Sequence, residues 1–297
     1  MLYLWGKIPK QQTTNSQYIL QSMNKTPIGI FDSGYGGLTI LNEIRKLLPE
    51  YDYVYLGDNA RSPYGSRSCE VVYKFTKQAV DTLFDLGCPL VILACNTASA
   101  KALRTIQQLD LPQSGDSSRR VLGVIRPTVE VIEKLSVGGH VGVLATQGTV
   151  SSHSYQIEIN KLFPDVKVTE EACPLWVPLV ETGESESPGA DYFVRKHLEQ
   201  LIAKDDSIDT IILGCTHYPL LIPKMKRLLT PTIKLVPQGE IVAKSLTDYL
   251  ERHPEMDKRL SRNGSIRYLT TESCDKFKDL ASVFLSDDIK AEHINID

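Results

Sequence analysis

The stretch Val91-Ile92-Leu93-Ala94-Cys95-Asn96-Thr97 is a hydrophobic run that ends in a cysteine followed by polar residues. In the other half of the chain, Ile211-Ile212-Leu213-Gly214-Cys215-Thr216-His217 repeats the pattern. A second pair, Ile28-Gly29-Ile30-Phe31-Asp32-Ser33-Gly34 and Val141-Gly142-Val143-Leu144-Ala145-Thr146-Gln147-Gly148, echoes at nearly the same separation. Short apolar runs bounded by turn residues are typical of buried strands. We therefore predict two related half-molecules, each with one thiol at the carboxyl end of a strand.

The composition is that of a globular protein with room for two domains. The 297 residues are 42% hydrophobic and 23% charged, and the formal net charge is −3. Because there is no basic block, the electrostatic footprint of a nucleic-acid-binding protein is missing. No apolar run approaches the roughly 20 residues that a membrane helix requires. We expect a cytoplasmic protein without nucleic-acid or membrane partners, and the sequence leaves the oligomeric state open, a homodimer included.

Six cysteines are scattered along the chain and form no Cys-x-x-Cys pair. In a long chain this spacing argues against a disulfide framework and against a structural zinc site. We expect reduced thiols and no bound metal.

Residues 1–23 are expected to form a disordered leader. The apolar run Leu2-Tyr3-Leu4-Trp5 is too short for the core of a signal peptide and is followed by polar residues. Met23, just before the first predicted strand, is an alternative start.

In the first half of the chain, apolar runs alternate with helical periodicity. Strands are predicted at residues 27–31, 51–56 and 90–94, and helices at 38–48 and 68–86. Ser68 can cap the second helix. This alternation indicates a parallel sheet, and such sheets bind ligands at the carboxyl ends of their strands.

A second alternating set follows a linker candidate at residues 111–118. Its predicted strands lie at 121–125, 140–145, 166–170 and 210–213, and its helices at 128–135, after Ser152 and at 192–203. The remaining residues are predicted to hold strands near 235–236 and 266–270 and helices near 241–250 and 275–285.

We therefore predict an α/β fold of two similar parallel-sheet domains related by pseudo-symmetry, with the active site in the cleft between them. The first domain takes residues 24–117 and about 233–297 and carries Cys95. The second takes residues 118–232 and carries Cys215.

The loop Asp32-Ser33-Gly34-Tyr35-Gly36-Gly37 superficially resembles a glycine-rich phosphate cradle. It lacks the full Gly-x-Gly-x-x-Gly spacing, and Asp32 would place a carboxylate where a pyrophosphate has to lie. We therefore favour a tight turn that presents Asp32 and Ser33 at a helix amino terminus. Backbone donors there favour a small carboxylate ligand.

Cys95 and Cys215 each end a predicted strand and precede hydroxyl or amide residues. A buried, inert thiol is the ordinary alternative for either one. A helix amino terminus after each thiol would lower its pKa, and the matching halves favour a functional pair. His217 shares no ligand spacing with the other histidines, so we interpret it as a neutral imidazole that orients substrate or assists proton transfer to Cys215. A hydrogen-bonded structural histidine is the alternative.

Four blocks of the sequence resemble the glutamate racemases, members of the cofactor-independent aspartate/glutamate racemase superfamily. The resemblance runs from about Pro27 to the end of the chain and keeps the family's order. The blocks are Gly29-Ile30-Phe31-Asp32-Ser33-Gly34-Tyr35-Gly36-Gly37-Leu38, Gly57-Asp58-Asn59-Ala60-Arg61-Ser62-Pro63-Tyr64-Gly65, Ala94-Cys95-Asn96-Thr97-Ala98-Ser99 and Leu213-Gly214-Cys215-Thr216-His217-Tyr218-Pro219-Leu220.

This resemblance implies a racemase that interconverts L-glutamate and D-glutamate without a cofactor and supplies D-glutamate for peptidoglycan. Racemisation removes the α-proton on one face and returns a proton on the other, so it needs one base and one acid. In the family the first cysteine serves the D-enantiomer and the second the L-enantiomer. The resemblance therefore assigns D-glutamate to Cys95 and L-glutamate to Cys215.

Carried over position by position, the family's substrate contacts fall on Asp32, Ser33, Tyr64, Gly65, Asn96, Thr97, Thr216 and His217. Asp32 is expected to pair with the substrate ammonium group or to tune the Cys95 thiol. Glu181 matches an acidic position near the second cysteine and, with Asp32 and His217, is assigned a supporting acid/base role. Its ordinary interpretation is an exposed glutamate before a turn.

The chain departs from the family pattern in its leader, at Arg126-Pro127-Thr128, and at Leu235-Val236-Pro237-Gln238-Gly239, where many members have an Asp-Ser pair. None of these departures touches the thiols. Other functions stay open: racemisation of aspartate or of a broader range of amino acids, a decarboxylase or isomerase that uses one cysteine, and a cleft that only binds an acidic metabolite.

Overall fold

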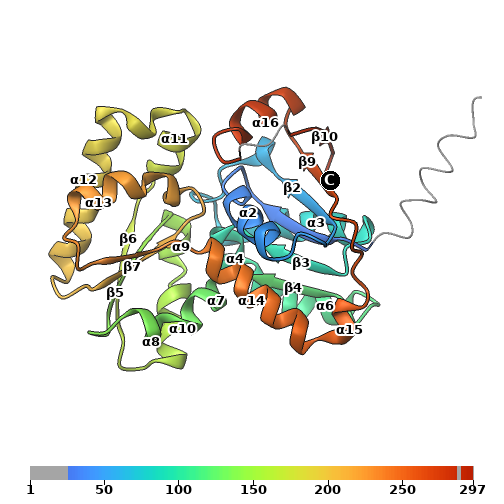
Figure 1. The fold of residues 1–297 in the computed structure, drawn as a ribbon, viewed down its shortest axis with the longest axis horizontal. Coiled ribbons are helices and arrows are strands. Elements are labelled where there is room, and N and C mark those ends of the chain that lie inside the picture. The colour runs from blue at the N-terminus through green and yellow to red at the C-terminus, as the bar shows by residue number, and fades with distance from the viewer. Residues whose placement is uncertain (1–25, 286–288, 297) are drawn as a thin grey trace, which may run out of the picture.

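Two α/β units lie side by side, each built on a parallel sheet (Figure 1). The computed structural model describes residues 26–285 and 289–296, so the predicted leader lies outside the described residues. The predicted fold class is confirmed. Among the described residues, each helix is too short or too polar to span a lipid bilayer.

The first sheet has the strand order β10-β9-β2-β1-β3-β4, with all neighbours parallel. Alternate side chains point to opposite faces of a strand, so Ile30 and Phe31 belong to two different cores, one on each face. Burial on both faces explains why the central strands of this sheet are almost entirely apolar. The strands are β1 (Ile28–Asp32), β2 (Tyr53–Gly57), β3 (Leu90–Leu93), β4 (Arg120–Gly123), β9 (Ile266–Thr270) and β10 (Ala291–His293).

The second sheet has the order β6-β5-β7-β8 and is also parallel. Its central strand β7 again sends alternate residues into two cores, with Ile211 on one face and Ile212 on the other. The strands are β5 (His140–Ala145), β6 (Lys167–Ala172), β7 (Thr210–Gly214) and β8 (Lys234–Val236).

Helices cover both faces of each sheet. Ser68 caps the helix α3 as predicted, because its hydroxyl accepts a hydrogen bond from the backbone of Val71. The helices are α2 (Leu38–Leu47), α3 (Cys69–Asp85), α4 (Asn96–Lys101), α5 (Leu103–Thr105), α6 (Leu111–Gln113), α7 (Ile125–Glu130), α8 (Ile132–Leu135), α9 (Gln147–Ser151), α10 (Ser154–Leu162), α11 (Trp176–Glu181), α12 (Pro188–Lys204), α13 (Ile222–Leu228), α14 (Gly239–Arg252), α15 (Pro254–Asp257) and α16 (Cys274–Ala281).

Parallel pairing brings the polar loops of each sheet to one edge. In the first sheet, Asp32 ends β1 and Cys95 follows the adjacent strand β3. In the second sheet, Thr146 and Cys215 follow the adjacent strands β5 and β7. Both thiols therefore stand at carboxyl edges, where parallel α/β sheets bind ligands.

Two edge strands lie in the opposite sheet from the one predicted. β4, expected to open the second domain, pairs with β3 in the first sheet. β8, expected to begin the return to the first domain, pairs with β7 in the second. The predicted boundaries at residues 118 and 233 each assign one strand to the wrong sheet, because an apolar strand pattern does not specify which sheet edge the strand joins.

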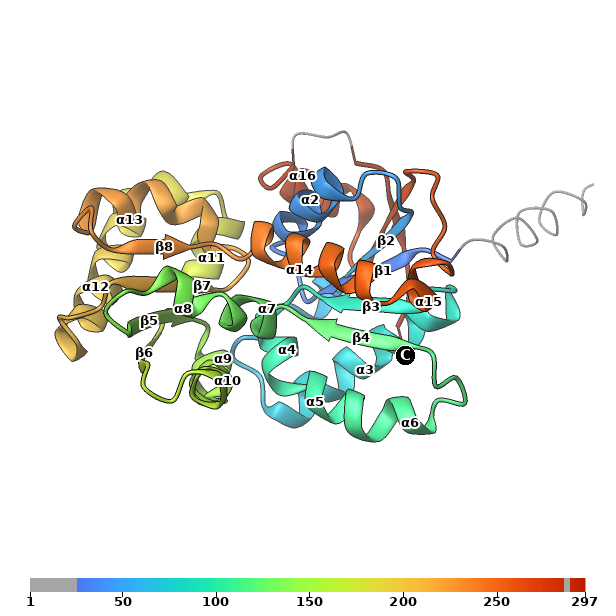
Figure 2. The ribbon, with the colours of Figure 1, turned by 60° about the horizontal axis from the view of Figure 1, so that its bottom comes forward.

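Helix α14 carries the chain back from the second unit to the first (Figure 2). It follows β8 and packs against α2, and its apolar face, which includes Val242 and Leu246, joins a core of the first sheet. β9 then pairs with β2, and β10 with β9.

Asp52 anchors the loop through which the returning chain enters β9. Its carboxylate is 2% exposed and accepts hydrogen bonds from the Ser265 hydroxyl (2.6 Å), the Asn263 amide (2.6 Å) and the Ser265 backbone (2.9 Å). Burial alone would raise the pKa of Asp52, but hydrogen bonds outweigh it and lower the pKa to about 2.

Replacing this carboxylate should destabilise the fold in a pH-dependent way. Asp52→Ala should lower the free energy of unfolding at neutral pH by about 2 kcal/mol, because buried donors lose a charged acceptor. The folded-state pKa lies below the ordinary value of 3.8, so the unfolded chain binds the proton first as the pH falls. The stabilisation is therefore complete above about pH 4 and is lost towards about pH 2.

Urea unfolding at about pH 7 and about pH 3 measures this effect. Asp248→Ala, on the exposed face of α14 and paired with Arg252, is the control. A destabilisation by Asp52→Ala that is the same at both pH values would contradict the prediction.

Candidate active site

A cavity of about 90 Å³ lies between the carboxyl edges of the two sheets, and both Cys95 and Cys215 line it. Loops of the first sheet and loops of the second both contribute to its wall. Most of the predicted site residues come together here. The lining residues are Asp32, Ser33, Ser62, Pro63, Tyr64, Gly65, Ser66, Cys95, Thr97, Thr146, Gln147, Pro174, Val177, Pro178, Cys215, Thr216 and His217.

Cys95 is the residue that caps helix α4. Its sulfur accepts a hydrogen bond from the backbone N–H of Ala98 (3.4 Å) and lies 3.2 Å from the Ser33 hydroxyl oxygen. Burial and, to a smaller extent, the nearby Asp32 raise the pKa of Cys95 to about 12, although the Ser33 and Ala98 contacts oppose the shift. The thiol form of Cys95 is therefore favoured in the free protein.

Asp32 lies near Cys95 and is almost fully buried. Burial raises the pKa of Asp32, while the charge of His217 and the backbone N–H groups of Gly37 and Gly34 oppose this. The N–H of Gly34 donates directly to the carboxylate (3.0 Å). We expected the backbone N–H groups of this loop to bind a carboxylate ligand. Some of them instead donate to the carboxylate of Asp32 in the same loop.

Cys215 has a different partner, the imidazole of His217. Their sulfur and Nδ1 atoms are 3.8 Å apart, and the opposite ring nitrogen of His217 lies 2.9 Å from a carboxylate oxygen of Glu181. Burial would lower the pKa of His217, but hydrogen bonds to Cys215 and Glu181 raise it to about 10. This direction favours the imidazolium over the neutral imidazole that we expected, because each ring nitrogen of His217 lies next to a group that can accept its proton, the Cys215 sulfur or a Glu181 oxygen.

An aromatic side chain from the returning tail covers His217. The ring of Phe284 meets the imidazole edge-on, at 89° and with 5.4 Å between ring centroids. Phe284 is partly buried and packs against cores of both units. It thereby limits the water that reaches the pair of His217 and Glu181, which strengthens their electrostatic interaction.

The other predicted residues divide into those that line the cavity and those behind it. Thr97 and Thr216 line it, and so does Tyr64, whose hydroxyl donates to Asp58. The Thr97 hydroxyl also lies 3.0 Å from that of Thr146, across the two units. Asn96, predicted as a substrate contact, is not among the lining residues, because its side-chain amide is bonded elsewhere.

Glycines allow the two units to approach closely at the site. A Cβ atom at Gly36 would overlap the Thr216 hydroxyl and the His217 ring. On the other flank, a Cβ at Gly65 would lie 2.9 Å from the Cβ of Thr146, and the Gly65 carbonyl accepts a hydrogen bond from Gly148 (2.7 Å). The family blocks thus contain glycines where one loop lies directly against the other unit.

Several lining residues were missed by the sequence reasoning. Thr146 had a signal, because it follows β5 as Ser33 follows β1 in the echoing segment of the other half. No such sequence signal marked the apolar lining residues Pro174, Val177 and Pro178. They are apolar residues around the start of α11, and nothing in a single sequence separates apolar lining residues from ordinary core residues.

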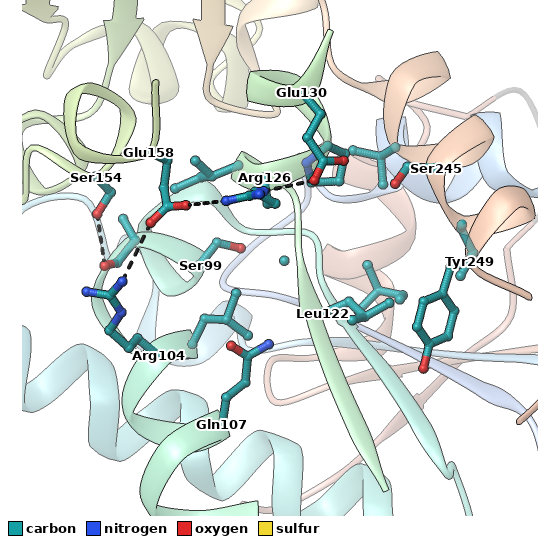
Figure 3. A pocket seen from close by; sticks show the side chains of 18 of the residues that line it. Ser99, Arg104, Gln107, Leu122, Arg126, Glu130, Ser154, Glu158, Ser245 and Tyr249 are labelled. Atoms are coloured by element: carbon teal, nitrogen blue, oxygen red, sulfur yellow. Dashed lines mark hydrogen bonds and ion pairs between the residues drawn. The ribbon is translucent and has the colours of Figure 1, made fainter. Parts of the chain in front are cut away.

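A larger cavity, about 570 Å³, lies elsewhere, between β4, α5, α7, α10 and α14 (Figure 3). It contains no cysteine among its lining residues. Its central charged groups pair with one another: Arg126 contacts Glu130 and Glu158, and Arg104 also reaches Glu158. Chemistry, rather than size, therefore identifies the smaller cavity as the candidate active site.

Within the part of the chain that the structure describes, no three or more His, Cys, Asp or Glu side chains gather in a way that could hold a metal ion. The polar side chains around the thiols are instead hydroxyls, the amide of Gln147, one imidazole and two carboxylates. This donor set suits a small charged organic molecule.

Comparison with known proteins places this site in a family. Residues 38–244 match the model of the Asp/Glu/Hydantoin racemase family. A glutamate racemase of Ruegeria sp. (strain TM1040) is 40% identical over 275 residues, which cover 89% of this chain and 98% of the relative.

Solved structures agree with the sequence comparison. The glutamate racemase isoform RacE1 of Bacillus anthracis superposes with a TM-score of 0.81 at 33% identity, covering 92% of this chain and 98% of that one. The glutamate racemase of Francisella tularensis subsp. tularensis SCHU S4, solved in complex with D-glutamate, gives 0.80 at 32% identity, covering 92% and 99%. The chain therefore belongs to the Asp/Glu/Hydantoin racemase family and is a racemase, an isomerase, of its glutamate racemase group.

Proposed function

We propose that this protein interconverts L-glutamate and D-glutamate by proton transfer between the substrate α-carbon and two thiols, those of Cys95 and Cys215, without a cofactor. The observation that carries the proposal is that two thiols from different sheets line one small cavity. A substrate held between them has an acid/base group available to each face of its α-carbon, as racemisation requires.

The two thiols have different surroundings. The sulfur of Cys215 lies beside the imidazolium of His217, which Glu181 holds, while burial and Asp32 favour the thiol form of Cys95. In the L-to-D direction the Cys215 thiolate takes the α-proton, the carbanion charge spreads into the α-carboxylate, and the Cys95 thiol delivers its proton to the opposite face. The D-to-L direction requires the reverse protonation states.

Glutamate is favoured as the substrate because the similar Francisella protein was solved with D-glutamate bound. The wall of the cavity offers hydroxyl donors for carboxylate oxygens on both sides, among them Ser33, Thr97 and Thr216. Asp32 is the carboxylate available for the ammonium group. D-Glutamate made in this way would serve peptidoglycan synthesis.

Isotope exchange tests the two-thiol mechanism. In heavy water and without added cofactor, glutamate of either configuration should gain α-deuterium while its optical rotation decays. Cys95→Ala and Cys215→Ala should each slow racemisation by about 10²–10⁴-fold, because each removes one acid/base group.

Cys69→Ala is the matched control, since Cys69 is exposed at the start of α3, and it should leave the rate unchanged. Aspartate run in parallel tests the choice of substrate. Unchanged racemisation in either active-site variant would remove that cysteine from the mechanism.

The pH dependence should report on His217. Glu181→Gln removes the negative charge that favours the imidazolium, so the pKa of His217, about 10 in the native protein, should fall. Because the imidazolium beside Cys215 is present only below the pKa of His217, the variant should begin to lose activity at a less alkaline pH than the native enzyme does. The alkaline limb of kcat/KM against pH should therefore move to lower pH.

Glu184→Gln, an exposed change just beyond α11, is the control for this profile. An alkaline limb that stays in place in Glu181→Gln would show that the carboxylate does not act through His217.

The close approach at Gly36 should be essential for turnover. Gly36→Ala adds a methyl group that overlaps Thr216 and His217, so the loop must shift away from the second unit. Because misplacement of a catalytic group by about 1 Å can cost about a hundredfold, kcat should fall by at least tenfold. Gly189→Ala is the control, because a Cβ there meets only the Ser187 hydroxyl, at 3.5 Å. Native-like kcat in Gly36→Ala would contradict the described packing.

A further inference from the structure

The two internal departures from the family pattern meet in space behind the active site. Gln238, at the start of α14, is 2% exposed, and its side-chain amide donates to the Thr128 hydroxyl (2.9 Å) and to the Tyr155 hydroxyl (2.8 Å). It also lies 3.2 Å from the carbonyl oxygen of Val124. Gln238 thus joins the start of α14 to α7 and α10.

Gln238, Tyr155 and Asn96 form a closed ring of hydrogen bonds. The Asn96 amide donates to the Gln238 carbonyl oxygen (2.6 Å), the Gln238 amide donates to the Tyr155 hydroxyl (2.8 Å), and that hydroxyl donates to the Asn96 carbonyl oxygen (2.7 Å). Every member is buried, and each donates once and accepts once within the ring. The amide orientations of Asn96 and Gln238 are therefore fixed, since rotating either one would leave buried groups unpaired.

This hydrogen-bonded ring contacts the backbone next to both cysteines. Asn96 directly follows Cys95 and is the first residue of α4. The ring of Tyr155 packs on Gly214, the residue before Cys215, so closely that a Cβ at Gly214 would lie only 3.0 Å from it. Tyr155 therefore spans the distance between the two thiol-bearing segments, and Gln238 holds it against Asn96.

We propose that Asn96, Tyr155 and Gln238 are positioning residues that together set where the Cys95 thiol stands relative to the segment that carries Cys215. The inference rests on the proposed two-thiol racemisation and adds to it a set of residues that do not line the cavity. Gln238 is central, because it bonds to both other members.

Two variants open the ring with little change in volume. Gln238→Met removes the amide, and Tyr155→Phe removes the hydroxyl but keeps the packing on Gly214. Each should lower kcat roughly tenfold to a hundredfold, since small displacements of an acid/base group have effects of this size. The KM for glutamate should change less than about threefold, because neither side chain lines the cavity.

Isotope effects distinguish positioning from a general loss of structure. The equilibrium constant between the enantiomers fixes the ratio of the two kcat/KM values, so a defect at one thiol cannot change that ratio. The defect instead changes how far the proton transfer at that thiol limits the rate in each direction. With Cys95 displaced, the primary isotope effect on kcat/KM should rise for α-deuterated D-glutamate and fall for α-deuterated L-glutamate. Less folded protein would lower both rates and leave both isotope effects unchanged.

The double variant tests whether the two residues act as one unit. Because either change alone opens the ring, Gln238→Met with Tyr155→Phe should cost no more than about twofold beyond the worse single variant. Lys244→Ala, an exposed change on α14, is the control and should match the native enzyme. Urea unfolding of each variant confirms that it is folded.

The outcomes separate this inference from the proposed function. If the native protein does not racemise glutamate, the proposed function fails before any variant is compared. If it does, the inference is overturned by single variants that keep kcat within about twofold, by unchanged isotope effects, or by losses that multiply in the double variant.

Discussion

The chemistry of this protein depends on the direct contact between the carboxyl edges of two sheets. The loop after β1 lies against Thr216 and His217 with a glycine, Gly36, at the point of contact, and Gly65 lies as closely against Thr146 on the other flank. A thiol at the end of one strand could not act with a thiol from another sheet if these loops were held apart by side chains. The absence of a Cβ at two positions thus permits a small cavity with a cysteine in each half.

Within that cavity, matching strands carry thiols with unlike surroundings. Cys95 caps a helix beside the buried carboxyl group of Asp32, whereas Cys215 lies beside the imidazolium of His217. Both thiols are nearly inaccessible, so each sulfur is surrounded by protein groups rather than by water. The repeat in the sequence places the two thiols in equivalent positions, as the proposed two-thiol racemisation needs, and the neighbouring side chains make their electrostatic surroundings different.

Most elements of the fold follow from local patterns. The apolar runs place β1, β3, β5 and β7, and they also place Cys95 and Cys215 at strand ends, because alternating strands and helices leave few other topologies. The sheet to which each of the edge strands β4 and β8 belongs was not predicted correctly. β4 and β8 have ordinary strand sequences, and only their pairing with β3 and β7 assigns each to a sheet. The apolar residues of the cavity wall were not predicted as site residues for a related reason, since an apolar lining residue and a core residue are chemically alike.

Taken alone, the sequence determined the duplicated architecture, the two thiols and the polar loops around them, because strand periodicity, turn residues and family blocks are local properties. The tertiary structure decided what those groups contact. It turned Asn96 away from the cavity towards Tyr155 and Gln238, and it placed the Cys215 sulfur and Glu181 on the two ring nitrogens of His217, which raises the pKa of that ring. These contacts join residues far apart in the chain, so their distances and burial, which set pKa values and positions, exist only once both sheets are assembled.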